Sequence, residues 1–101
     1  MKPVSINFTD DKGKTIKTYT TCSLKTGVMD NIFDIAERAE TLKDGNVSDA
    51  KEFYQDLKSI ILKVFKYQFS LEELNDGAEQ DELMRVFKDI CSKISGEMKK
   101  N

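Results

Sequence analysis

Hydrophobic and polar residues alternate near the start of the chain. Val4, Ile6 and Phe8 are each followed by a polar residue, which is the period-two pattern of a strand with one buried face. Residues 15–21 are rich in β-branched side chains, and the loop before them contains a glycine that suits a hairpin turn. The pattern predicts a β-hairpin over about residues 4–21. Because a two-stranded hairpin is marginally stable alone, we expect it to pack on helices or to gain a strand from another chain.

Beyond the hairpin, apolar residues recur every three or four positions, which is the spacing of helices with one buried face. This spacing predicts helices over about residues 27–43, 48–67, 71–75 and 79–95. The second of these helices has the widest apolar face, so we expect it at the centre of the fold. Ser70 to Glu73 matches a capping box for the short helix, and Asn75-Asp76-Gly77 is expected to end that helix.

The central positions of the two longest apolar faces are expected to form the core. These positions are Leu57, Ile61, Val64, Phe87, Ile90 and Ile94. A chain of 101 residues fits one domain and can bury a modest hydrophobic core. The sequence therefore predicts a single α+β domain over residues 1–101, in which the N-terminal β-hairpin packs on a bundle of about three main helices plus one short helix.

Composition narrows the classes of function. The chain contains no histidine, which removes the commonest general base and most zinc sites, and no other catalytic grouping stands out. The two cysteines are far apart, and no acidic segment has the spacing of a calcium loop. We therefore expect no enzyme activity, no metal and no cofactor.

Charge and hydropathy narrow the classes of partner and the location. The formal net charge of −2 argues against binding driven by phosphate neutralisation, so we expect no nucleic-acid partner. The longest apolar run, Ile60-Ile61-Leu62, is too short to cross a membrane. The chain shows no signal peptide, which favours a cytoplasmic protein.

Three apolar residues lie outside the predicted core faces. Leu62 lies opposite the main apolar stripe of its helix, and Met29 and Phe33 flank the stripe of the first helix, one turn apart. Methionine and aromatic side chains recur at protein contacts. Met29, Phe33 and Leu62 are therefore candidate protein-interaction residues, either for a second copy of the chain or for another protein.

Two segments carry a resemblance to a known family. They are the hairpin INFTDDKGKTIKTYTT, Ile6–Thr21, before the first helix and the segment YQFSLEELNDG, Tyr67–Gly77, before the last helix. In this order they resemble the small tail assembly chaperones of long, non-contractile-tailed phages and prophages of low-GC Gram-positive bacteria. The most specific part is an aromatic residue, a hydroxyl cap, an acidic pair, a leucine and Asp-Gly. Ala78 departs from the pattern, because a larger apolar residue is common there.

The resemblance implies a function without an active site. Such chaperones bind the tape measure protein, keep it soluble while the tail is built, and help to recruit tail tube subunits. They work in the host bacterial cytoplasm and are absent from the finished virion. Many are also made in a longer form by programmed ribosomal frameshifting, and the codons of Lys99-Lys100-Asn101 can form the slippery run A-AAA-AAN.

Two other functions stay open from the residues. The first alternative is a small intracellular regulatory or inhibitory protein that binds one folded protein target. The second is a nucleic-acid accessory protein that uses the hairpin lysines. It is the weaker of the two, because Asp10 and Asp11 accompany Lys12 and Lys14 in the loop.

Overall fold

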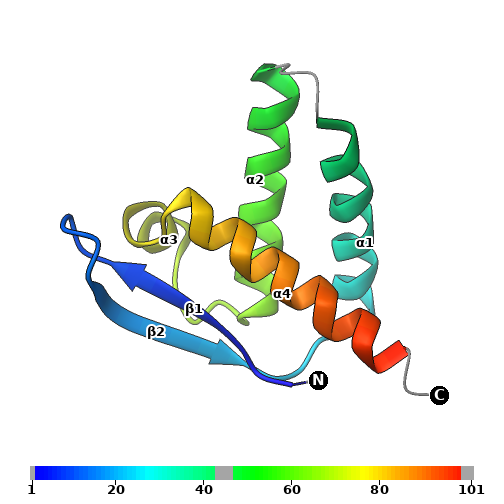
Figure 1. The fold of residues 1–101 in the computed structure, drawn as a ribbon, viewed down its shortest axis with the longest axis horizontal. Helices are drawn as coiled ribbons and strands as arrows, with labels where there is room; N and C mark the ends of the chain where they lie inside the picture. Colours follow the sequence, from blue (N-terminus) through cyan, green and yellow to red (C-terminus); the bar gives the residue numbers. More distant parts are fainter. Residues whose placement is uncertain (1, 43–46, 99–101) are drawn as a thin grey trace.

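The computed structural model of the protein describes residues 2–42 and 47–98. The elements follow in the order β1 (Val4–Thr9), β2 (Thr15–Thr21), α1 (Thr26–Thr41), α2 (Val47–Val64), α3 (Leu71–Gly77) and α4 (Gln80–Met98). The predicted α+β architecture, a hairpin followed by three longer helices and a short one, is confirmed (Figure 1). Helices α1 and α2 stand side by side, and α4 passes their lower part beside β1. The codon hypothesis for residues 99–101 lies outside the described residues.

The hairpin forms where the alternating pattern predicts it. Strands β1 and β2 are antiparallel, with Val4 opposite Thr21 and Ile6 opposite Tyr19. In the loop, Gly13 has a φ of 81° and its N–H donates to the Asp10 carbonyl at 3.0 Å. This left-handed conformation favours glycine, which explains the residue in the turn.

The core lies between β1 and the helices. All six residues expected at its centre, namely Leu57, Ile61, Val64, Phe87, Ile90 and Ile94, are buried. Val4, Ile6 and Phe8 of β1 are buried with them, whereas most of β2 is exposed. Helices α3 and α4 both contact β1. Strand β1 is therefore the packed strand of the hairpin and β2 is its outer strand.

Helix α2 ends at Val64, before the end at residue 67 that the apolar spacing predicted. The Tyr67 N–H donates to the Leu62 carbonyl at 2.9 Å, and the Lys66 N–H donates to the Lys63 carbonyl at 3.0 Å. These two bonds form a Schellman motif, whose left-handed position is usually glycine. Lys66 occupies that position with a φ of 57°, and Tyr67 follows with a φ of 59°.

Replacement of Lys66 by glycine should therefore stabilise the protein. A non-glycine residue in the left-handed region costs about 1–2 kcal/mol. Glycine increases the entropy of the unfolded chain, and the Lys66 contact with Ser23 is lost, so the net gain should be about 0.5–1 kcal/mol. Urea denaturation measures the change.

Lys63→Gly is the control, because Lys63 is exposed in the last turn of α2. Glycine within a helix costs about 1 kcal/mol, so this variant should be less stable than the wild type. Equal losses in both variants would contradict a left-handed Lys66.

Candidate protein-interaction site

The segment Tyr67–Gly77 anchors the hairpin on the helices. The Phe69 ring is buried, with its centroid 5.0 Å from that of Phe8, 4.8 Å from that of Tyr19 and 5.6 Å from that of Phe65. Phe8 and Phe69 meet edge to face, a favourable geometry for aromatic rings. Phe69 thus joins both strands to the turn that follows α2.

The predicted capping box at the start of α3 is confirmed. The Glu73 N–H donates to Ser70 Oγ at 3.1 Å, and the Ser70 N–H donates to Glu73 Oε1 at 3.0 Å. Leu74 lies in the same helix and is buried. The cap fixes the start of this short helix and holds Leu74 in the core.

Gly77 is the last residue of α3, and it packs against the strand. A Cβ atom at this position would lie 2.8 Å from Phe8 Cδ2, closer than the packing tolerates. Its φ is not in the left-handed region. Gly77 is therefore needed for the close approach of α3 to Phe8, in addition to ending the helix as the sequence indicated.

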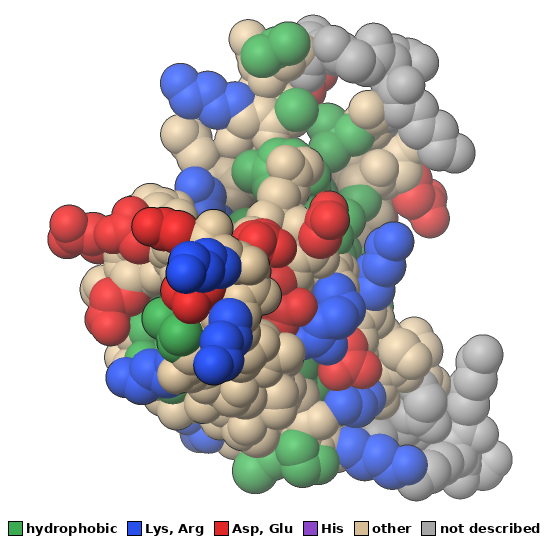
Figure 2. Space-filling view, turned by 60° about the vertical axis from the view of Figure 1, so that its left-hand side comes forward, with side chains coloured by type: hydrophobic (Ala, Val, Ile, Leu, Met, Phe, Trp, Pro, Cys, Tyr) green, Lys and Arg blue, Asp and Glu red, His purple; other side chains and the backbone are tan. Residues whose placement is uncertain are grey.

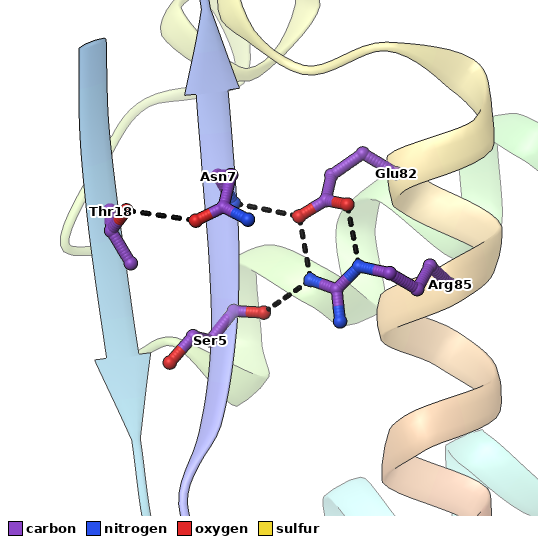
Figure 3. Close-up of polar contacts among 5 residues, drawn as sticks. All are labelled: Ser5, Asn7, Thr18, Glu82 and Arg85. Atoms are coloured by element: carbon purple, nitrogen blue, oxygen red, sulfur yellow. Dashed lines mark hydrogen bonds and ion pairs between the residues drawn. The ribbon is translucent and has the colours of Figure 1, made fainter. Parts of the chain in front are cut away.

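A polar contact ties β1 to the first turns of α4 (Figure 3). The Asn7 N–H donates to Glu82 Oε2 at 2.7 Å, and Arg85 donates to both carboxylate oxygens of Glu82 at 2.6 Å. Arg85 also donates to the Ser5 carbonyl at 2.8 Å. Two side chains from α4 thus form hydrogen bonds with backbone groups of β1 that point away from β2. Sequence analysis missed this contact, because the acid–base pair at spacing i, i+3 does not identify a strand as its partner.

The surroundings of Glu82 favour its charged form. Partial burial opposes ionisation, but the hydrogen bonds from Arg85 and Asn7 and the Arg85 charge outweigh it and hold the pKa of the Glu82 carboxyl below its usual range. The ionic contact is therefore present at neutral pH.

The structure brings the three interaction candidates to one end of the α1–α2 pair. These helices are antiparallel, so Met29 and Phe33 near the start of α1 lie at the same end as Leu62 near the end of α2 (Figure 1). Phe33 is 41% exposed, whereas Met29 and Leu62 are half-buried against the core. Phe33 offers the largest accessible surface of the three. The role of these residues in protein contacts stays a prediction.

The described part of the chain offers little for metal or thiol chemistry. Within residues 2–42 and 47–98, no group of three or more His, Cys, Asp or Glu side chains is placed to hold a metal ion. Cys22 is exposed and Cys91 half-buried, and both thiols are free. Burial raises the pKa of the Cys91 thiol, which makes it less reactive. None of the helices in these residues is both long and apolar enough to span a membrane.

A protein-family model described as "Phage tail chaperone protein" matches residues 1–101. The chain belongs to the phage tail chaperone family. Comparisons with curated proteins and with solved structures each gave no significant match. The match confirms the tail chaperone resemblance of the sequence, while the tail type and the Gram-positive host stay predictions. In this chaperone, Tyr67–Gly77, the segment with the most specific part of the resemblance, anchors the hairpin, which is the other segment that carried it.

Gly77→Ala should destabilise the chaperone by about 1–3 kcal/mol, because the added methyl group would push into the buried Phe8 ring. Thermal denaturation should show a melting temperature lower by several degrees. Gly27→Ala is the matched control, since a Cβ at that position meets nothing within 4 Å. A Gly77→Ala variant as stable as Gly27→Ala would contradict the close packing of α3 on β1.

Glu82→Gln should lower the free energy of unfolding at pH 7 by about 1–2 kcal/mol, through loss of the ionic hydrogen bonds. The folded-state pKa is depressed, so the Glu82 contribution is present above the unfolded value of about 4.3 and is lost as the pH falls through the lower folded value. The difference between variant and wild type should therefore shrink below about pH 4. Asp81→Asn, an exposed neighbour, controls for loss of charge at the start of α4. A difference that does not change with pH would rule out the ionic contact.

Proposed function

We propose that this chaperone binds the tape measure protein during tail assembly, keeps it soluble, and helps to recruit tail tube subunits around it. The family match over residues 1–101 carries the proposal. The protein acts without catalysis, in the cytoplasm of the host bacterium, and does not remain in the finished virion. The regulatory or inhibitory alternative has no comparable support.

The surface of the chaperone suits a hydrophobic client. Figure 2 shows hydrophobic side chains exposed among acidic and basic ones, and some of them lie in the upper part, where α2 begins. Val47 at the start of α2 is 81% exposed. A charged exterior keeps such a protein soluble, and exposed apolar side chains give a client its contacts.

Phe33 is the strongest candidate contact, and Met29 supports it from one turn away. The exposed face of α1 can receive an amphipathic helix of the client, with Phe33 as an aromatic anchor. Leu62 is a secondary candidate, because it is half-buried against the core.

Co-expression tests the proposal. The chaperone, expressed with the tape measure and tail tube proteins of the same phage, should bring the tape measure protein into the soluble fraction. Phe33→Glu should weaken this binding about tenfold or more, as expected for loss of an aromatic anchor. Circular dichroism should show an unchanged fold, because Phe33 is not a core residue.

Lys51→Glu on α2 is the control for a new carboxylate at an exposed helical position. A tape measure protein that stays insoluble with the wild-type chaperone would refute the proposed function. Equal binding by Phe33→Glu and Lys51→Glu would refute only the contact assigned to Phe33.

A further inference from the structure

The two edges of the sheet differ in how far other side chains cover their backbone groups. The sheet has two strands, and β2 forms the outer rim, with no third strand from the described residues beside it (Figure 1). The opposite edge, on β1, is occupied by Glu82 and Arg85 near its middle, and Lys93 Nζ donates to the Pro3 carbonyl at 2.5 Å. From the described residues, the β2 rim receives one side-chain hydrogen bond, from Gln68.

Backbone geometry identifies the open groups on the β2 rim. In an antiparallel pair, residues opposite each other direct their backbone groups either both inward or both outward. The Ser5 carbonyl and the Asn7 N–H point away from β2, since α4 binds them. Their opposite residues, Thr20 and Thr18, must therefore point away from β1.

The position of Gln68 agrees with this assignment. Gln68 Nε2 donates to the Thr20 carbonyl at 2.9 Å from outside the hairpin. Gln68 covers only the C-terminal part of β2, and the Thr18 N–H and carbonyl face outward beyond it. Such groups are a template for an added strand.

A lysine side chain on an edge strand often blocks the addition of another strand. The Lys17 side chain is instead directed toward the Tyr19 ring. Its ammonium lies 5.0 Å from the centroid of its own Tyr19 ring. That ring packs against Phe8 and Phe69, on the helix-facing side of the sheet. Lys17 therefore leaves the rim accessible and places a positive charge beside it.

Exposed apolar side chains occur on β2 and in the segment that contains Gln68. Among the described residues, five large hydrophobic side chains are exposed, and three of them belong to β2 or to the segment Tyr67–Gly77. Ile16 is 64% exposed, Tyr67 is 65% exposed and Leu71 is 47% exposed. Tyr67 and Leu71 lie within three positions of Gln68, which binds the rim directly. Strand β2 thus carries an exposed apolar side chain, Ile16, as well as open backbone groups.

We propose that the β2 rim is a docking site for an extended segment of a tail protein, which adds to the sheet as a third strand. Strand β2 carries Lys17 and no acidic residue, while Asp10 and Asp11 lie in the neighbouring loop. The segment that fits therefore places an acidic side chain opposite Lys17, among β-branched or apolar ones. The partner class rests on the proposed function. The rim geometry stands independently of it.

A second copy of this chain fits the rim less well. Antiparallel self-pairing centred on Lys17 places that residue opposite its own copy, and like charges directly opposite are destabilising. Pairing centred on Thr18 brings Ile16, where the register of the hairpin shifts, opposite Thr20 of the other copy. Gln68 already donates to the carbonyl of that Thr20. The repulsion between the two Lys17 side chains and the bond from Gln68 to the Thr20 carbonyl both disfavour self-pairing. A strand from another protein, with an acidic residue opposite Lys17, fits better.

Amide hydrogen exchange on the full-length chain, free and bound to the tail protein that co-purifies with it, tests the docking. The Thr18 amide should exchange at least tenfold more slowly in the complex. The amides of Lys17 and Tyr19 face β1 and should change little. Slowed exchange at Thr18 in the free chain, together with a dimer in sedimentation, would overturn the choice of occupant in favour of a second copy.

Thr18→Pro removes the outward N–H and should abolish strand addition, whereas Thr18→Val keeps the amide and should bind like the wild type. Lys14→Glu with Lys17→Glu should weaken binding more than tenfold. Lys51→Glu with Lys88→Glu, which changes the net charge equally at exposed helical positions, should leave it unchanged. The charge variants keep the test decisive if Thr18→Pro does not fold.

The outcomes separate the two proposals. A complex that forms while Thr18 exchange is unchanged would overturn strand docking and leave the proposed function intact. No complex with either tail protein would overturn the proposed function, and with it the occupant of the rim.

Discussion

The attachment of a two-stranded hairpin to a helical body governs the rest of this structure. A hairpin of this size is not stable alone, so the contacts of β1 decide whether it forms. Val4, Ile6 and Phe8 of β1 are almost fully buried, and each contributes roughly 1.5–3 kcal/mol through burial. Phe69 adds ring contacts with Phe8 and Tyr19. Apolar burial is therefore the larger part of the attachment energy, and the ionic contact of Glu82 is the smaller part.

The hydrogen bonds of Glu82 and Arg85, although they contribute less energy, determine where the hairpin lies along α4. Burial of aromatic rings is not directional, whereas the bonds from Glu82 and Arg85 reach particular backbone groups of Ser5 and Asn7. A slip of one residue along β1 would break these bonds and turn the buried strand face to solvent. Apolar packing and polar contacts thus hold the hairpin in one register.

Local patterns in the sequence were sufficient to predict much of the fold. Alternation identified the hairpin, helical spacing identified the core residues of α2 and α4, and the Ser70–Glu73 pair identified the start of α3. Two features were not predictable in this way, one local and one between distant residues. The end of α2 depends on a left-handed lysine where glycine is usual, and the partner of Glu82 lies 75 positions away. The burial of Met29 and Leu62 was not predictable either. A helical wheel shows that they lie beside the apolar stripe, but not that both are half-buried against the core.

The closed edge of β1 limits how far the sheet can grow. Fibrous aggregation by strand pairing needs two open edges on every subunit, one to receive a neighbour and one to extend the array. Here the side chains of α4 occupy one edge. If two copies met through β2, the outer strands of the pair would both be β1, and the assembly would end at two. The hydrogen bonds from α4 to β1 therefore limit any assembly through β2 to a dimer.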